Sequence, residues 1–208
     1  YINKKAHLCL KHVINTMTIT GLMSGTSLDG VDMALCDITE HGYRVLKATT
    51  VPYPTEWRQR LACLDKATAF EYALTDVELG HYMGRLIHEF LADVDTPFDA
   101  VASHGHTIFH RPEMGLTTQI GNGDAIAAEC RLPVISNFRT LDVALGGQGA
   151  PLVPIGDELL FGEYDACLNL GGIANISYRK ENGQREAFDI CPCNMPLNLL
   201  AARLGLDY

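Results

Sequence analysis

The feature that most constrains this chain is a glycine-rich loop between two strand-like segments near its start. Thr18–Met23 and Val31–Ile38 alternate as half-buried β-strands do, and the turn-rich segment Ser24–Gly30 joins them. Because glycine tolerates positive φ, the backbone N–H groups of such a loop can converge on an anion, and the hydroxyls of Ser24, Thr26 and Ser27 add donors. We therefore predict a phosphate-binding loop, with an ordinary Asp-Gly hairpin turn as the alternative.

The same plan of strand, glycine turn and strand returns late in the chain. Ala166–Leu170 and Ile173–Tyr178 flank Gly171–Gly172, which makes that turn a second candidate phosphate loop. Between and after these repeats we predict an alternation of both element types, which indicates an α/β fold. The expected strands are Tyr43–Val51, Phe98–Ser103, Leu116–Ile120, Val134–Ser136 and Glu186–Ile190, and the expected helices are Thr55–Phe70, Val77–Asp93 (with a Thr75/Glu78 capping box), Asp124–Cys130, Leu152–Phe161 and Met195–Arg203.

The repeat also predicts the domain organisation. Residues 17–162 form a first lobe, and residues 163–208 form the start of a second one. About 44 residues are too few for an independent core, so we expect this second lobe to be cut short. Residues 1–16 have no apolar core of a signal peptide, and we interpret them as an extension or a misplaced start.

Charge and cysteine content bound the environment of the protein. The formal net charge of −9 argues against nucleic acid and against an anionic membrane surface as partners. No apolar run is long enough to span a membrane. The seven cysteines are an odd number scattered through apolar stretches, which favours buried, reduced thiols in a cytoplasmic protein.

Two further polar segments predict one wall of a substrate-binding site. Ser103–Thr107 follows a strand and carries His104 and His106, which point the same way if the strand continues. No third ligand follows at zinc spacing, so sugar contacts and structural histidines are the two interpretations. Arg139 opens the segment Arg139–Pro151, and its planar guanidinium suits a carboxylate, with an ordinary long turn as the alternative interpretation of the glycines in this segment.

Asp189 ends a strand just before the last predicted helix. Its carboxylate is either an N-terminal cap of that helix or a general base at the junction between the two lobes. The chain has none of the Walker A, G-x-G-x-x-G or G-x-S-x-G motifs.

Taken together, these blocks resemble the anhydro-N-acetylmuramic acid kinase family of actin-like ATPases. The similarity runs in family order from Met17 through GLMSGTSLDGVD (Gly21–Asp32), SHGHTIFH (Ser103–His110), QIGN (Gln119–Asn122), FR…DVALGGQGAPLVP (Phe138–Pro154), NLGGIANIS (Asn169–Ser177) and FD…P.N (Phe188–Asn194). The first and fourth blocks are long and specific.

The resemblance implies two lobes, each built on a ribonuclease-H-like mixed sheet with flanking helices, and ATP in the cleft. It implies phosphorylation of O6 of 1,6-anhydro-N-acetylmuramic acid while water opens the anhydro ring at C1, giving N-acetylmuramic acid 6-phosphate for peptidoglycan recycling. The substrates are then ATP and a small amino sugar, with Mg²⁺ as cofactor and a homodimer as a candidate assembly.

The resemblance also implies roles for individual residues. Asp189 matches the catalytic base, Asp29 or Asp32 is a candidate Mg²⁺ ligand, and two larger groups match binding positions. The ATP phosphates are expected at Gly25, Thr26, Ser27, Leu28, Asp29, Gly30, Val31, Asp32, Gly171 and Gly172; the sugar is expected at Ser103, His104, His106, Thr107, Arg139 and Asn194.

Two departures from the family pattern bear on this assignment. Cys191 and Cys193 replace two glycines of the family motif x-Gly-Pro-Gly-Asn, which costs about 1–2 kcal/mol each if those positions need positive φ. Family members also continue well beyond residue 208, so we expect this chain alone to be inactive. Another sugar kinase of the same superfamily without ring cleavage, and a non-catalytic nucleotide-binding module, are the alternative functions.

Overall fold

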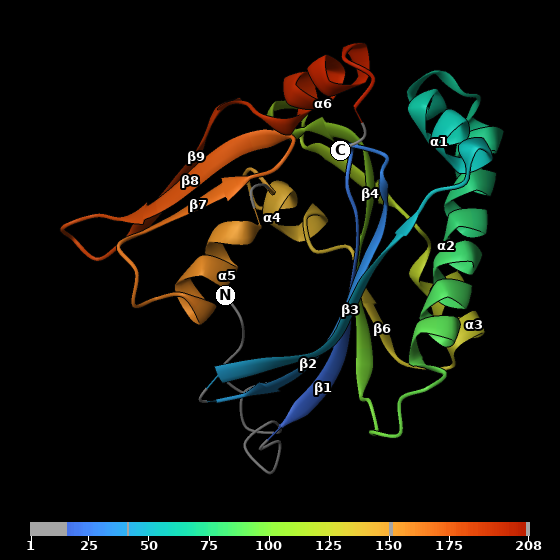
Figure 1. Cartoon of the computed structure of the whole chain (residues 1–208), viewed down its shortest axis with the longest axis horizontal. Helices are drawn as coiled ribbons and strands as arrows, with labels where there is room; N and C mark the ends of the chain where they lie inside the picture. Colours follow the sequence, from blue (N-terminus) through green and yellow to red (C-terminus); the bar gives the residue numbers. More distant parts are fainter. Residues whose placement is uncertain (1–15, 41, 150–151, 207–208) are drawn as a thin grey trace.

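The computed structural model describes residues 16–40, 42–149 and 152–206, arranged around two β-sheets (Figure 1). The first sheet contains β1 (Met17–Ser24), β2 (Gly30–Thr39), β3 (Gly42–Pro52), β4 (Ala100–Arg111), β5 (Leu116–Ile120) and β6 (Val134–Ser136). The expected extension over residues 1–16 lies, apart from Thr16, outside the described residues.

The first sheet is mixed, as predicted. Its order is β3-β2-β1-β4-β5, and β6 also pairs with β4. The pairs β1–β4 and β4–β6 are parallel, whereas β1–β2, β2–β3 and β4–β5 are antiparallel. The α/β class with flanking helices is therefore confirmed.

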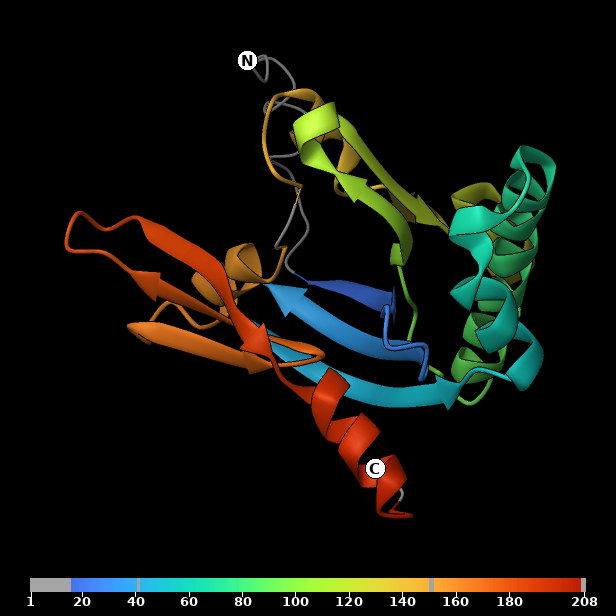
Figure 2. The ribbon, with the colours of Figure 1, turned by 90° about the horizontal axis from the view of Figure 1, so that it is seen from above.

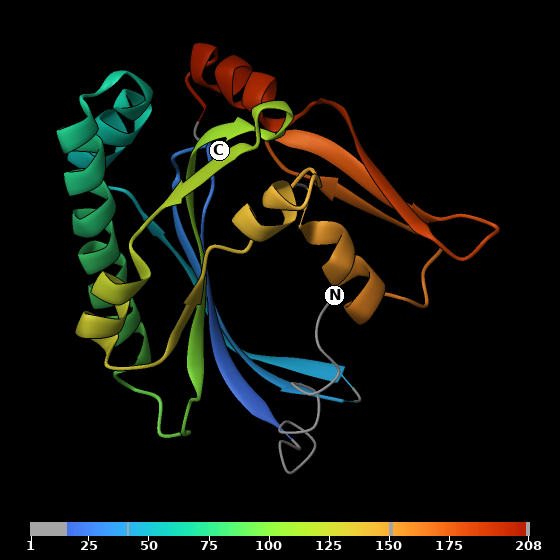
Figure 3. The same ribbon diagram turned by 180° about the vertical axis from the view of Figure 1, so that it is seen from behind.

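Three helices cover one face of this sheet: α1 (Thr55–Ala62), α2 (Ala69–Leu91) and α3 (Gly123–Cys130) (Figures 1 and 3). The apolar face predicted for the long helix is buried, because Leu79, Met83 and Ile87 are fully shielded against strand residues such as Val31 and Val101. Two glycines of α2 let α3 approach, since a Cβ on Gly80 would lie 2.5 Å from the backbone oxygen of Asn122. The core thus lies between the sheet and this helical layer.

The helical layer differs from the prediction at two places. The expected helix Thr55–Phe70 is interrupted by a 3-10 turn at Leu64–Lys66. The long helix begins eight residues earlier than expected, because Thr68 and Glu71 form its capping box. Thr75, the expected cap, is buried inside α2, where its hydroxyl donates to the backbone oxygen of Glu71 and accepts from Arg60. A threonine inside a helix can satisfy its hydroxyl this way, so the Thr75/Glu78 box was a wrong prediction.

The second sheet is an antiparallel meander of β7 (Ala166–Leu170), β8 (Ile173–Arg179) and β9 (Arg185–Pro192), followed by α6 (Asn194–Arg203) (Figure 2). Two helices connect the sheets, α4 (Thr140–Ala144) and α5 (Val153–Leu160). The ion pairs of α5 are with the second sheet, because Glu158 contacts Arg179 and Arg185. The expected boundary at 162–163 therefore falls after a helix that contacts the second sheet, and the division into lobes stays a prediction.

The prediction of buried, reduced thiols is met only in part. The six cysteines in the described ranges are free thiols, but Cys63 and Cys191 are exposed rather than buried. Cys9 lies outside those ranges. Within the described part of the chain, no helix is both long and apolar enough to cross a membrane.

Candidate functional site

The loop between β1 and β2 exposes its polar side chains, whereas its leucine packs against the core. Leu28 adopts a left-handed conformation (φ 60°) and packs against the core, while its N–H donates to the backbone oxygen of Gly25 at 3.3 Å. Thr26 and Ser27 are exposed at the tip. The Asp29 Oδ1 atom accepts from the Ser27 hydroxyl at 2.7 Å and from the Gly30 N–H at 3.1 Å. The loop therefore offers two hydroxyls and one carboxylate to whatever lies beyond it.

Tyr53, the residue after β3, holds both ends of this loop. Its hydroxyl donates to Ser24 Oγ at 2.8 Å, and its backbone N–H donates to the Asp29 backbone oxygen at 3.2 Å. The ring stacks on Tyr82 of α2 at 6.0 Å between centroids. Burial raises the pKa of Tyr53 to about 12, so the phenol stays protonated and remains a donor.

The second glycine turn lies between β7 and β8. Its backbone oxygens accept hydrogen bonds from the start of α6: Asn194 N–H to Gly171 at 3.0 Å and Cys193 N–H to Gly172 at 2.9 Å. The Asn194 side chain donates to the Leu170 backbone oxygen at 2.9 Å. Cys193 has φ −124°, and Cys191 is not among the described residues with positive φ. The expected strain from replacing the family's glycines therefore does not arise.

A cavity of about 850 Å³, here called the inter-sheet cavity, joins the two loops. Its lining brings together the two predicted phosphate loops, the first turns of α6 and one arginine of α1: Thr26, Ser27, Asp29, Arg58, Gly171, Gly172, Asn194, Met195, Asn198, Leu199 and Ala202. α6 lies at the same end of the molecule as the β1–β2 loop (Figures 1 and 3). Asn194, expected near the sugar, lies instead with the glycine loops.

Other predicted phosphate residues do not line this cavity. Gly25 and Leu28 shape the loop turn, and Gly30 lies so close to β3 that a Cβ would be 2.3 Å from the Val51 oxygen. Val31 is fully buried in the core. Asp32 faces the other side of β2, where its Oδ1 accepts from the Thr50 hydroxyl at 2.5 Å. These residues support the loop or belong to a different cavity.

The two histidines of β4 do not form one wall, contrary to the prediction. Gly105 has φ +73°, and the β1–β4 register shifts at this point, so that Ser24 pairs with His106. His106 is consequently 3% exposed, with its Nδ1 atom 2.8 Å from Ser24 Oγ. His104 is half-buried and lines two cavities that do not include His106. Thr107 lines neither cavity and accepts from the Gln119 side chain at 3.4 Å.

Arg139 lies next to His104. Its Nε atom donates to His104 Nε2 at 3.0 Å, which requires a neutral ring with the proton on Nδ1, where the Gly105 oxygen accepts it at 3.0 Å. Burial lowers the pKa of His104, and the charge of Arg139 lowers it further. The two terminal nitrogens of Arg139 have no hydrogen-bond partner in the described ranges, so the outer edge of the fork is available to a carboxylate.

His104 also borders a polar cavity of about 340 Å³ where β5 and β6 diverge from β4, here called the fork cavity. Asp76, Asn122, Asn137 and Thr140 line it too. Two buried lining atoms, Ser103 Oγ and Gln119 Oε1, have no hydrogen-bond partner among the residues that the structure describes. Because an unpaired buried polar atom costs about 1–3 kcal/mol, this cavity suits a ligand or water that supplies the missing bonds.

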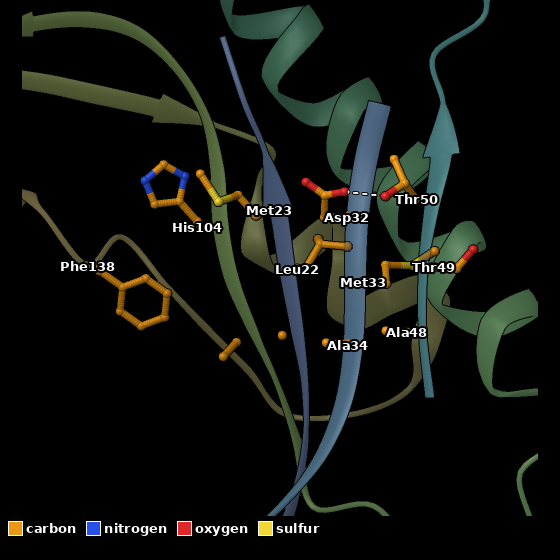
Figure 4. A pocket seen from close by; sticks show the side chains of 12 residues that line it. Leu22, Met23, Asp32, Met33, Ala34, Ala48, Thr49, Thr50, His104 and Phe138 are labelled. Atoms are coloured by element: carbon orange, nitrogen blue, oxygen red, sulfur yellow. Dashed lines mark hydrogen bonds between the residues drawn. The ribbon is translucent and has the colours of Figure 1, made fainter. Parts of the chain in front are cut away.

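The second cavity beside His104, about 600 Å³, lies on the open face of the first sheet (Figure 4). Its floor is a row of small residues in register across four strands: Ala48, Ala34, Gly21 and Ala102. Figure 4 shows Asp32 and Thr50 on one side of this hollow, with His104 and Phe138 on the other. A mainly apolar floor with polar groups at its margins suits the face of a sugar ring.

Asp189 is exposed and pairs with Asn175 across β8 and β9. Alternate residues of a strand share a face, so Asp189 lies on the face of β9 that carries Ala187 and Arg185. Arg185 uses that face to bind Glu158 of α5 at 2.9 Å. Asp189 therefore lies toward α5, but it does not line the inter-sheet cavity, and its side chain makes no hydrogen bond within the described ranges.

The described residues contain no cluster of three or more histidine, cysteine or acidic side chains suited to a metal ion. A single carboxylate with substrate phosphates is, however, a common way to hold Mg²⁺. Asp29 fits that role, because it lines the inter-sheet cavity and its two hydrogen bonds use only Oδ1. Asp32 does not fit that role as well, because Asp32 lines the cavity on the open face of the first sheet.

Sequence reasoning missed Tyr53 and Arg58. Both follow a strand that was predicted, but neither lies in a glycine-rich or histidine-rich motif. The Pro-Tyr-Pro run at 52–54 is the one local signal, because it marks a rigid turn that delivers the chain from β3 into α1.

Comparisons with known proteins agree with the motifs. A family model described as anhydro-N-acetylmuramic acid kinase matches residues 17–204. A protein of that name from Paramagnetospirillum magneticum is 43% identical over 190 residues, covering 88% of this chain and 53% of the relative. Another from a Picosynechococcus strain is 37% identical over 207 residues, covering 90% of this chain and 54% of the relative. The chain thus spans about half the length of the curated relatives it matches.

Solved structures offer only a distant likeness. The crystal structure of an Aquifex aeolicus member of the Ppx/GppA family matches 88% of this chain and 54% of its own, with 12% sequence identity and a TM-score of 0.43. At that score the likeness supports no conclusion about this chain.

Proposed function

This chain belongs to the anhydro-N-acetylmuramic acid kinase family, and we propose that it forms part of an ATP-dependent kinase acting on 1,6-anhydro-N-acetylmuramic acid. The reaction would phosphorylate O6 and open the anhydro ring with water, giving N-acetylmuramic acid 6-phosphate in cytoplasmic peptidoglycan recycling. One observation carries the proposal: the inter-sheet cavity gathers Thr26, Ser27 and Asp29 with Gly171 and Gly172, although more than 140 residues separate the two loops along the chain.

The inter-sheet cavity has the donors that a polyphosphate needs. Thr26 and Ser27 supply hydroxyl groups, and Gly171 and Gly172 expose backbone without side chains. The amino-terminal end of α6, a helix of 10 residues, also faces the cavity through Asn194 and Met195. The N–H groups of Asn194 and Met195 are already bonded to Gly171 and Gly172, so α6 offers the cavity the positive end of its dipole rather than free N–H donors.

ATP, as second substrate, supplies the phosphoryl group, and Mg²⁺ neutralises part of its charge. In this proposal Asp29 would hold the metal ion through its other carboxylate oxygen, while its Oδ1 stays bonded to Ser27 and Gly30. The Asp29 carboxylate would therefore have two roles, because one oxygen orders the loop and the other binds the cation.

The sugar is proposed to lie beside His104. The outer edge of Arg139 would bind the lactyl carboxylate, and neutral His104 would present its ring to the sugar. The unpaired Ser103 Oγ and Gln119 Oε1 would bind hydroxyl or amide groups in the fork cavity. His106 and Thr107 have no such position and are left out of this proposal.

Asp189 is proposed as the base. Water would attack C1 as the C1–O6 bond breaks, and the proton released by the water would go to the Asp189 carboxylate. O6 would bond to the γ-phosphorus of ATP while the bond from that phosphorus to the bridging oxygen breaks and ADP leaves. Support comes from its place in the family motif; in this structure Asp189 lies on the face of β9 directed toward α5 and lines neither the inter-sheet cavity nor the two cavities beside His104.

Calorimetry on this chain tests binding. We expect heat of binding with 1,6-anhydro-N-acetylmuramic acid, and Arg139→Gln is expected to weaken that binding by about tenfold. Binding of a non-hydrolysable ATP analogue without any sugar binding would favour a non-catalytic nucleotide module. If neither compound binds, the proposal is wrong for this chain.

The ring-opening step needs a polypeptide of the relatives' length that contains residues 17–204. There, Asp189→Asn is expected to abolish ring cleavage and phosphorylation together, because both depend on the same attacking water. Glu181→Gln, in the exposed turn between β8 and β9, is the matched control and is expected to leave both unchanged. Residual phosphorylation of an ordinary sugar by Asp189→Asn would favour a kinase without ring cleavage.

A further inference from the structure

Arg58 is an unpaired cation facing the inter-sheet cavity. It is one of the residues that line this cavity, together with residues of both glycine loops. Within the described ranges it forms neither an ion pair nor a side-chain hydrogen bond, whereas Arg60, two residues later, pairs with Glu78 and Thr75. Several other arginines in the described ranges also lack a carboxylate partner, but Arg58 is the arginine that lines the inter-sheet cavity, so its guanidinium is available to an anionic ligand there.

The position of Arg58 is fixed relative to the β1–β2 loop. Tyr53 binds both ends of that loop, and α1 begins two residues after Tyr53. The Arg58 N–H donates to the Pro54 oxygen at 3.1 Å, which closes the first turn of α1. One short rigid segment therefore connects the loop hydroxyls to the guanidinium.

We infer that Arg58 is a phosphate-binding residue of the inter-sheet cavity, whose guanidinium contacts the non-bridging oxygens of a bound polyphosphate. The inference rests on the proposed nucleotide site and adds a residue that no motif assigns to it. The surroundings suit this contact: the Thr26 hydroxyl lines the same space, Ser27 donates its hydroxyl to Asp29, and Asp29 is the one carboxylate in the lining. The planar fork of arginine matches two phosphate oxygens at once.

The test measures binding of inorganic tripolyphosphate to this chain by calorimetry, because that probe carries the phosphates without the nucleoside. Arg58→Ala is expected to raise the Kd by at least about tenfold, and Arg58→Lys is expected to give an intermediate value, since it keeps the charge but loses the fork. Lys66→Ala is the control: Lys66 is an exposed, unpaired cation of the same helical layer that does not line the cavity, and we expect less than about a twofold change.

A stability measurement and a comparison of the binding results distinguish the possible outcomes. The melting temperature of Arg58→Ala is expected to match that of the parent chain, because the side chain is exposed and unpaired; Arg58→Gln is the substitute if the alanine variant does not fold. Tight tripolyphosphate binding that Arg58→Ala leaves unchanged would overturn the inference and leave the nucleotide site standing. Failure of the parent chain to bind tripolyphosphate or the ATP analogue would overturn both.

Discussion

The Nδ1 atom of His106 lies 2.8 Å from Ser24 Oγ, and both side chains are almost completely shielded from solvent. The Tyr53 hydroxyl donates to the same Ser24 oxygen, so the Ser24 proton is directed to His106. This order requires His106 to be a neutral acceptor. The chain Tyr53–Ser24–His106 therefore joins β3, β1 and β4 directly beneath the loop that faces the inter-sheet cavity.

The buried imidazole predicts a pH dependence of stability. Burial, and to a smaller extent the nearby His104, lower the pKa of His106 to about 4. Between that value and the unfolded pKa near 6.5, the unfolded chain binds more protons, so the free energy of unfolding rises with pH across this window and levels off above it. The contribution is at most about 3 kcal/mol.

Urea unfolding from pH 4 to 8 measures this effect against His106→Gln, which keeps a side chain able to form hydrogen bonds but does not titrate. We expect the stability difference between the parent and the variant to grow as pH rises from 4 to 6.5 and to stay constant above that. Parallel curves for the two proteins would contradict a lowered pKa for His106.

Removing the Tyr53 hydroxyl tests the same chain from its other end. Tyr53→Phe is expected to lower the free energy of unfolding by about 1–2 kcal/mol, because Ser24 loses a buried donor. Tyr178→Phe removes an exposed hydroxyl bonded to Glu186 and is expected to change stability by less than about 0.5 kcal/mol. Equal effects of the two substitutions in urea unfolding would count against a structural role for the Tyr53–Ser24 bond.

Gly105 and Gly115 form a natural pair for testing the irregularity in β4. Both have positive φ, +73° and +69°, but a Cβ on Gly105 would lie 2.5 Å from the Ile120 oxygen, whereas one on Gly115 would meet nothing within 4 Å. Gly115→Ala is expected to cost about 1 kcal/mol from the backbone conformation alone. Gly105→Ala is expected to cost clearly more, about 3 kcal/mol or above, because the backbone must also move.

Thermal melts of the two glycine variants decide this prediction. The shift in melting temperature is expected to be at least twice as large for Gly105→Ala. A small shift for that variant would mean that β4 can adopt a regular register past His104.

The contact between Arg139 and His104 predicts a measurable pKa change. Arg139→Gln is expected to raise the pKa of His104, because a positive charge that disfavours protonation is removed, but burial should keep it below the ordinary value near 6.5. An NMR titration of the imidazole ring protons reports the pKa directly. Arg111→Gln, at an exposed arginine at the end of β4, is the control and should leave it unchanged.

A lower or unchanged His104 pKa in Arg139→Gln would show that the two side chains are not in contact in solution. That result would also remove the main support for a carboxylate site at Arg139, since the hydrogen bond to His104 is what holds the outer edge of the guanidinium in place.

Much of the fold follows from local patterns. The alternation in Thr18–Met23 and the apolar spacing of Leu79, Met83 and Ile87 predicted the correct buried faces, because each pattern matches the period of its element. The start of α2 was wrong because two threonine–glutamate pairs, at 68/71 and 75/78, carry the same capping pattern. Thr68 caps the helix, whereas the Thr75 hydroxyl is used inside it by Glu71 and Arg60, contacts that spacing along the chain does not reveal.

The site was predictable where the backbone itself carries the signal. Glycine-rich loops at 25–30 and 171–172 were expected together, and they line one cavity. The separation of His104 from His106 was not predictable, since it depends on the left-handed conformation of Gly105 and on the shifted pairing with Ser24. Arg58 was missed because its role depends on which element faces the loops, and that is decided by packing rather than by sequence order.

The double attachment of Tyr53 has a consequence for how this region tolerates insertions and deletions. Because Tyr53 binds both ends of the loop, the direction of the Arg58 side chain relative to the loop depends on the number of residues between Tyr53 and Arg58. Each residue added or removed in Pro54–Trp57 would rotate the downstream helix face by about 100°. Inserting or deleting one codon there would leave the loop and Tyr53 almost unchanged. It would nevertheless turn the Arg58 guanidinium toward bulk water or into the aromatic stack around Tyr82.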